Sequence, residues 1–228
     1  MSSNGRMASG AAALAIGAVL WGSTAFAQEE RVPRAIPAPA RAFEVQVGTG
    51  YTQGFGNIGP GTPIADVAGA GIGFTADLGY RFAPRWSLEA EGQYQQFAAE
   101  NGTGSNGFDL NIGTTFHARP QYRTDPWLRI GSGVRSLWQH NANRAIGNMG
   151  GPTSNTFLGW EAATARVGVD LRTRSNVAWA PFVGADLQTF QLQNATALPK
   201  WQWGTYVYAG MQGRFDLGGR SASGIATR

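Results

Sequence analysis

The chain has 228 residues, of which 43% are hydrophobic and only 14% charged, with 33 glycines, eight tryptophans and a single lysine, Lys200. Soluble domains typically carry about 25% charged residues, so this composition predicts a surface that is largely shielded from water. The net charge of +4 comes from the ends of the chain, because residues 43–217 hold twelve basic and twelve acidic side chains. This distribution argues against a nucleic-acid partner, which needs a basic face on the folded part. The lack of cysteine excludes disulfides and thiolate chemistry.

Residues 1–27 have the three parts of a secretory signal peptide: a polar start, an apolar run from Ala11 to Trp21, and small residues at the cleavage positions. The apolar run is shorter than the roughly 20 residues of a spanning helix. We therefore expect cleavage after Ala27 and export of the protein. Residues 28–41 contain three prolines, a composition that favours an extended periplasmic linker.

Residues 42–217 contain eight segments in which apolar and polar side chains alternate with the period of two that is typical of β-strands. Most exceed the common strand length of about 5 to 6 residues and match the roughly 9 to 11 of a membrane-spanning strand. The connections alternate between short turns and longer loops, of which Gly54–Asp66 and Asn141–Thr156 are the longest. This pattern predicts an outer-membrane barrel with its short turns in the periplasm. The segments lie at residues 43–51, 71–82, 86–94, 108–119, 128–138, 163–172, 179–188 and 202–217.

The polar face of these segments carries almost all their charges, eight acidic and seven basic, together with many glycines. A nearly neutral face crowded with glycine suits the narrow lumen of an eight-stranded barrel. The predicted fold is therefore all-β: a closed eight-stranded antiparallel transmembrane β-barrel with a polar, side-chain-filled lumen. The lumen charge network is predicted to comprise Asp77, Arg81, Glu89, Glu91, Arg129, Arg135, Arg166, Asp170 and Asp186.

Counting across the turn at Pro84 sets Asp77 opposite Glu91, and we expect Arg135 and Arg166 to neutralise these two carboxylates. Glu161 is the one strand charge on the apolar face, so it is predicted to lie near the outer rim. Aromatic residues gather near the segment ends, as in the two girdles that a bilayer favours. The predicted girdle residues are Tyr80, Phe82, Trp86, Trp138, Trp179, Trp203 and Phe215.

Two stretches resemble a known family. Residues 78–89, LGYRFAPRWSLE, are similar to the second hairpin of the small OmpA/OmpX-type outer-membrane barrels of Gram-negative bacteria. Residues 213–217, GRFDL, resemble the aromatic assembly signal at the end of that family's last strand, although here a flexible tail of residues 218–228 is expected to follow. The resemblance implies localisation in the outer membrane, contacts with its lipids and lipopolysaccharide, and recognition by the barrel-assembly machinery.

Candidate catalytic residues are few, because the chain has only two histidines. His140 lies in a run that resembles the His-x-Ser-Asn motif of lipid A deacylases, but Ala142 occupies the place of the nucleophile. Ser136 is about 13 Å away along a strand, beyond hydrogen-bond reach. His117 is expected to be a hydrogen-bonded residue of the interior. We therefore predict no catalytic residues, no cofactor and no metal site.

The sequence thus predicts a monomeric barrel with a structural or surface-interaction role, exerted through long extracellular loops. Two alternatives remain open. A narrow pore or channel would require a water path through the lumen charges, and a lipid A-modifying enzyme would have to start from His140.

Overall fold

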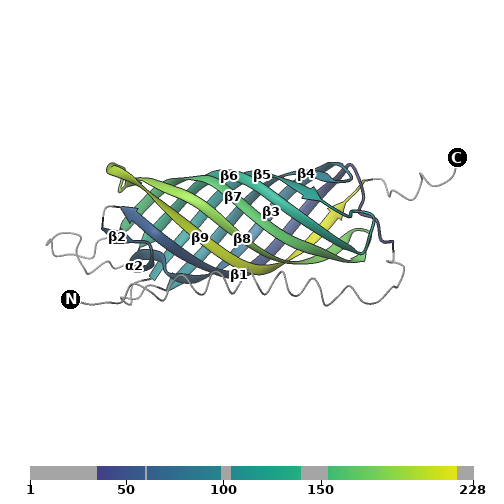
Figure 1. Ribbon diagram of the computed structural model, residues 1–228, viewed down its shortest axis with the longest axis horizontal. Helices are drawn as coiled ribbons and strands as arrows, with labels where there is room; N and C mark the ends of the chain where they lie inside the picture. Colours follow the sequence, from purple (N-terminus) through teal and green to yellow (C-terminus); the bar gives the residue numbers. More distant parts are fainter. Residues whose placement is uncertain (1–34, 60, 99–103, 140–153, 220–228) are drawn as a thin grey trace. The chain divides into compact units, whose positions relative to one another are not determined.

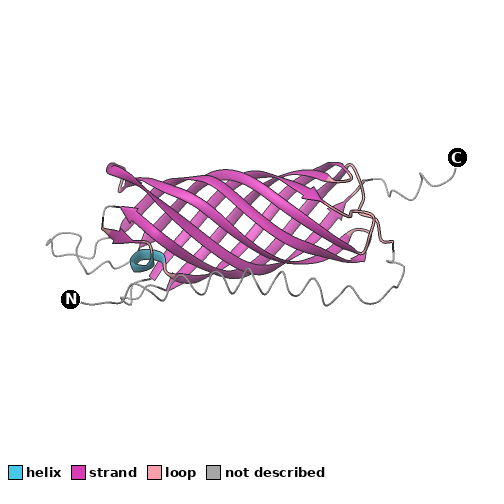
Figure 2. Cartoon of the chain, in the orientation of Figure 1, coloured by secondary structure: helices cyan, strands magenta, loops and turns pink. Residues whose placement is uncertain are grey.

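The computed structural model describes residues 35–59, 61–98, 104–139 and 154–219. The expected signal peptide, residues 28–34, His140 and most of the expected tail lie outside these residues. Nearly all of the described chain is β-strand, with one short helix (Figure 2). The elements are β1 (Ala42–Gly59), β2 (Thr62–Pro63), α2 (Ala65–Ala68), β3 (Ala70–Ala83), β4 (Trp86–Ala98), β5 (Gly104–His117), β6 (Thr124–Gln139), β7 (Asn155–Arg174), β8 (Val177–Gln193) and β9 (Thr196–Leu217).

The strands close into a barrel (Figure 1). Each long strand pairs antiparallel with the next along the chain, and β1 pairs with β9 from Phe43↔Leu217 to Gly56↔Gly204. Eight strands form the wall, while the two-residue β2 pairs only with the end of β1. Because the barrel is closed, every wall strand is paired along both edges. Strands in lipid require this pairing, since the bilayer core has no water to hydrogen-bond free backbone groups. Within the described residues, no helix is long and apolar enough to cross a bilayer.

The alternation of side chains separates the lumen from the outer surface. Large apolar residues along the strands point outward, as Ile72, Leu78 and Ile112 do with more than half of their surface exposed. The charged residues of the same strands point inward and are buried. An apolar wall around a charged interior is the reverse of a soluble barrel and is what a bilayer selects. The structure therefore confirms the predicted fold class.

The prediction for Glu161 is wrong, because β7 contains a β-bulge. The pairing of β7 with β8 jumps from Glu161↔Gln188 to Ala163↔Leu187, so Ala162 has no partner. One extra residue reverses the side-chain parity on one side of a bulge. Glu161 consequently points into the lumen, where it is 1% exposed, rather than outward at the rim.

The connections define two ends of the barrel. At one, here called the turn end, Pro84–Arg85 and Ser175–Asn176 join neighbouring strands. At the other, the loop end, β8 and β9 are joined by Asn194–Ala195 alone, whose φ values are 49° and 63°. Two positive φ angles are typical of the type I′ turn of a tight hairpin. The alternation of the connections predicted a longer loop after the seventh segment, at residues 189–201. In the structure most of these residues extend β8 and β9 instead.

Residues 35–41, the end of the expected linker, contact the turn end. Ala35 forms a bridge with Tyr122, and the Ala38 amide donates a 2.7 Å hydrogen bond to the Pro120 carbonyl. Ala38 and Pro39 are buried. The backbone hydrogen bonds and the burial of small residues hold this segment against the barrel, although its proline content favoured a free tether.

Candidate functional site

The lumen of the described barrel holds more acids than bases. Ten carboxylates are buried against six arginines and one histidine. The near neutrality expected from sequence fails because Arg119 is exposed, whereas Asp125 and Glu161 are buried. The buried acids are Glu44, Asp77, Glu89, Glu91, Asp109, Asp125, Glu161, Asp170, Asp186 and Asp216; the arginines are Arg81, Arg129, Arg135, Arg166, Arg172 and Arg214.

Glu91 is the centre of the middle part of the lumen. Arg129 on β6 and Arg166 on β7 face each other in register, and both bind the Glu91 carboxylate. Arg166 does so with two nitrogens, a fork that fits a carboxylate well. Asp77 lies opposite Glu91 in register, as the hairpin count predicted. Glu91 therefore binds two arginines, while Oδ1 of Asp77 has no hydrogen-bond partner in the described chain.

Arg135 does not reach the carboxylates that were predicted for it. It binds Asp109 on β5 through two nitrogens, and its Nη2 lies 2.8 Å from Asp186 on β8. Arg135 and Asp109 are direct cross-strand partners, so Asp109 is the nearest acid. Tyr208 links this group to the middle of the lumen, because its hydroxyl donates to Asp186 and accepts from Arg166, both at 2.8 Å.

The turn end of the lumen is closed by three arginines. Arg81 binds Glu44 at 2.5 Å, Arg172 binds Asp216 at 2.6 Å, and Arg214 binds Asp170 at 2.9 Å. All of these side chains are buried. Burying charges in this way is tolerable only when they are paired and hydrogen-bonded.

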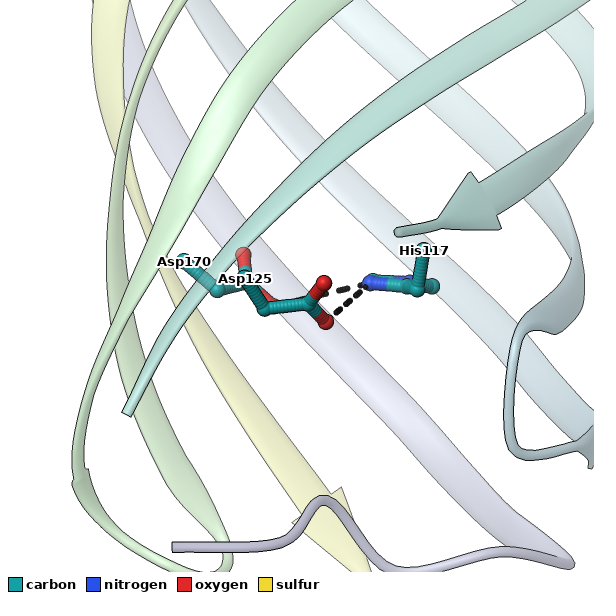
Figure 3. Close-up of side chains that lie close together, drawn as sticks. All are labelled: His117, Asp125 and Asp170. Atoms are coloured by element: carbon teal, nitrogen blue, oxygen red, sulfur yellow. Dashed lines mark hydrogen bonds and ion pairs between the residues drawn. The ribbon is translucent and has the colours of Figure 1, made fainter. Parts of the chain in front are cut away.

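His117 lies among these groups with Asp125 and Asp170 (Figure 3). Its Nδ1 is 2.8 Å from Asp125, and its Nε2 is 3.2 Å from Arg81 and 2.9 Å from Arg214. Because arginine can only donate, Nε2 accepts and the proton of the neutral ring is on Nδ1. Both ring nitrogens are thus bound, as expected for an interior histidine.

The same three residues have the composition of a metal site, since their ligand atoms lie within 4.8 Å of one another. A metal needs a free lone pair on histidine and a carboxylate that is not already neutralised. Here Nε2 faces two guanidinium groups, and Asp170 binds Arg172 and Arg214. The guanidinium groups of the arginines therefore fit these residues better than a metal ion would. Sequence analysis missed the grouping, because its members come from β5, β6 and β7.

The loop end of the lumen is filled by apolar side chains. Residues 62–69, here called the plug, fold back into the mouth, and Ile64 and Val67 are buried against the wall. A Cβ atom on Gly54 or Gly204 would overlap Ile64, so these glycines make room for its side chain. The Ser105 hydroxyl donates to the Val67 carbonyl. The remaining members of the cluster are Ile58, Ala68, Phe97, Leu137, Phe157, Phe190 and Tyr206.

The predicted girdle residues lie on the outer face, Trp138 included, because it alternates with the buried Leu137 and Gln139. Trp138 is half-buried, whereas the others expose between 38% and 57% of their surface. Tyr80, Phe82, Trp86, Trp179 and Phe215 are near the turn end, and Trp203 is near the loop end. Trp127 and Phe182, in contrast, point into the lumen and pack beside Tyr208.

Comparisons with known proteins concern the fold. No protein-family model matches the chain. No curated protein matches it. Among solved structures, Neisserial surface protein A is 13% identical with a TM-score of 0.53, over 76% of this chain and 96% of that chain. OprG from Pseudomonas aeruginosa is 9% identical over 78% of this chain and 98% of that chain, with a TM-score of 0.45.

Ail, the attachment invasion locus protein of Yersinia pestis, is 15% identical over 76% of this chain and 99% of that chain, with a TM-score of 0.41. At such identities the likeness concerns the fold alone. The fold comparison rests on Neisserial surface protein A, because its TM-score of 0.53 exceeds 0.5. The chain therefore has the fold of the small eight-stranded outer-membrane β-barrels, in agreement with the OmpA/OmpX-type resemblance of its sequence.

Proposed function

We propose that the protein is a closed, non-enzymatic outer-membrane barrel with a structural or surface-interaction role. The observation that carries this proposal is the filling of the lumen at three levels. The turn end holds the Arg81, Arg172 and Arg214 ion pairs, the middle holds Glu91 between two arginines, and the loop end holds the plug. An eight-stranded barrel encloses only enough space for side chains.

The orientation follows from the connections. Outer-membrane barrels have short turns in the periplasm and longer loops outside, so the turn end faces the periplasm and the loop end faces the exterior. The expected signal peptide brings the chain to the periplasm. The assembly machinery would then recognise the last strand. The barrel would be a monomer whose outer apolar belt contacts membrane lipids and lipopolysaccharide.

The two alternatives have less support. A pore would require at least one central ion pair to break, and a buried charge left without its partner costs about 3 to 5 kcal/mol. A lipid A deacylase would need a nucleophile beside His140, and Ala142 has no hydroxyl.

Conductance in a planar bilayer tests the proposal. The mature protein should show little or no steady current, because the lumen is filled. The Arg135→Ala and Arg166→Ala double variant should be less stable and should conduct if it still folds. A steady, large conductance of the unmodified protein would make the pore the better reading, and altered acyl chains in a lipid A mass spectrum would favour the enzyme.

Epitope tags test the orientation. A tag after Asn101, in the connection between β4 and β5, should be accessible to antibody on intact cells. A tag beside Arg85 should become accessible only after the outer membrane is permeabilised. The opposite result would reverse the orientation and leave the fold unchanged.

A further inference from the structure

The exposed charges of the barrel are distributed differently from the buried ones. Ten acids are buried in the lumen, and the one exposed acid of the described residues, Asp66, lies at the loop end. Five arginines are exposed, and all of them lie at the turn end, which is opposite α2 and β2 in Figure 1. The zero net charge of residues 43–217 therefore hides a basic end. These five residues, here called the arginine ring, are Arg41, Arg85, Arg119, Arg123 and Arg174.

The arginine ring extends around the barrel wall. Arg85 lies in the connection between β3 and β4, and Arg119 and Arg123 lie in that between β5 and β6. Arg174 ends β7 beside the connection to β8, and Arg41 precedes β1, which pairs with β9. In the closed strand order these positions follow one another around the barrel. A ligand that surrounds the barrel on all sides fits this distribution.

No acid neutralises the arginine ring within the described residues. None of its side chains forms an ion pair there, whereas the six buried arginines each bind a carboxylate. Asp125, the acid nearest in sequence to Arg123, is buried and accepts hydrogen bonds from the Arg119 amide and from His117. Five like charges at one end of the barrel create a positive potential that attracts anions.

The aromatic girdle places the arginine ring near the level of lipid headgroups. Trp86 follows Arg85 directly in the chain, and Phe43 follows Arg41 after one residue. Both aromatic side chains are exposed on the outer face of the wall. Aromatic belts lie at the headgroup level of a bilayer, and the long side chain of an arginine can extend its charge from this level to the phosphates.

The connections at the turn end lack the apolar contacts of a protein interface. No large apolar side chain is exposed at residues 84–85, 118–123 or 175–176. Protein–protein interfaces have a well-packed core from which charged residues are depleted. Arginine, by contrast, binds phosphate through its planar fork. The arginine ring therefore fits the phosphate groups of lipids better than a folded partner.

We propose that the arginine ring binds the headgroups of anionic phospholipids in the leaflet at the turn end, which is the periplasmic leaflet in the orientation proposed above. One arginine near an anionic membrane surface raises the association constant by about fivefold. The ring collects acidic lipids around the barrel and holds its turn end at the membrane surface. The acids of the turn end are buried in the lumen, so they do not expose negative charge to these lipids.

The test measures lipid association with the mature protein in phosphatidylcholine vesicles. Spin-labelled phosphatidylglycerol is compared with spin-labelled phosphatidylcholine, because electron paramagnetic resonance distinguishes lipids that contact a protein from free ones. We expect the wild type to associate about fivefold more strongly with the anionic lipid. About 1 M salt shortens the Debye length to about 3 Å and should bring this ratio close to one. A wild-type ratio of one at low salt overturns the proposal.

Substitutions in three connections locate the lipid site. The triple variant Arg85→Gln, Arg123→Gln and Arg174→Gln should lose most of the preference. The triple variant Arg85→Lys, Arg123→Lys and Arg174→Lys keeps the charge and should retain it. Lys200→Gln is the control for location, because Lys200 is an exposed cation at the loop end, and it should leave the ratio unchanged. If the glutamine triple variant keeps the wild-type ratio, or if Lys200→Gln lowers it equally, the arginine ring is not the lipid site.

Purified peptidoglycan tests the other anionic surface of the periplasm. If the wild type shows no lipid preference but sediments with peptidoglycan, and the glutamine triple variant does not, the ring binds the cell wall and the lipid proposal is wrong. The vesicle measurement does not depend on the orientation in the cell, because both leaflets contain the same lipids. The tags can therefore reverse the orientation while the lipid preference persists.

Discussion

The middle and the loop end of the lumen are closed in different ways. In the middle, Glu91 binds Arg129 and Arg166, so closure depends on charges that compensate one another. At the loop end, Ile64 and its neighbours fill the mouth with apolar side chains. Removing one partner of a buried ion pair leaves a bare charge, whereas shortening an apolar side chain leaves a cavity whose cost depends on how far the site collapses. The middle should therefore be the more sensitive to single substitutions.

The largest effect is expected at Arg166. Arg166→Ala removes both hydrogen bonds from the fork to Glu91 and the bond to Tyr208. Losing one partner of a buried ion pair destabilises by about 3 to 5 kcal/mol, which a urea titration in vesicles would measure. Arg119→Ala is the control, because Arg119 is exposed and its removal should change stability by less than about 0.5 kcal/mol. Equal stability of the two variants would mean that the ion pair between Arg166 and Glu91 does not stabilise the barrel.

A charge on the outer face tests the opposite side of the wall. Val167 on β7 is 45% exposed and adjoins Arg166, which is buried in the lumen. Val167→Arg should cost about 2 to 4 kcal/mol at the bilayer midplane, as measured by urea unfolding in vesicles. Thr173→Arg, near the turn end, should cost only about 0 to 1 kcal/mol because charge is tolerated near the interface. Equal costs would place the membrane belt elsewhere on the barrel.

A double-mutant cycle tests the fit of the plug. A Cβ on Gly204 would overlap Cδ1 of Ile64, and overpacking of this kind costs about 1 to 3 kcal/mol. Ile64→Val removes Cδ1, so Gly204→Ala should cost less in that background, with a coupling of at least about 0.5 kcal/mol. Gly213→Ala should show no coupling, since its Cβ would meet only ordinary contacts. Additive effects at Gly204 would mean that the Ile64 side chain does not pack against Gly204.

The periodicity of the sequence was sufficient to predict the barrel, because an alternation of two leaves only one face for lipid. It could not predict which acid each arginine reaches. Arg135 and Arg166 have the same pattern, yet one binds Asp109 across a strand pair and the other binds Glu91 across the lumen. The predicted orientation of Glu161 was wrong because of the bulge at Ala162. The alternation of apolar and polar residues resumes after the bulge, so the sequence pattern does not reveal it. The plug was missed because Ile64 and Val67 lie in a connection, where apolar residues are usually exposed.

The smallest effect is expected at the turns, where the two ends of the barrel differ again. Ala195 at the loop end has a φ of 63°, which costs a residue with a Cβ about 1 to 2 kcal/mol. Glycine avoids this cost but adds freedom to the unfolded chain, so Ala195→Gly should gain about 0.5 to 1 kcal/mol in urea unfolding. Asn194 is left unchanged, because its side-chain Oδ1 accepts a 2.8 Å hydrogen bond from the Thr156 amide and its Nδ2 donates one of 3.1 Å to Asn155. Asn176→Gly at the turn end should gain nothing, since Asn176 has no positive φ to relieve. A gain at Asn176 equal to that at Ala195 would mean that the type I′ geometry is not what distinguishes the two turns.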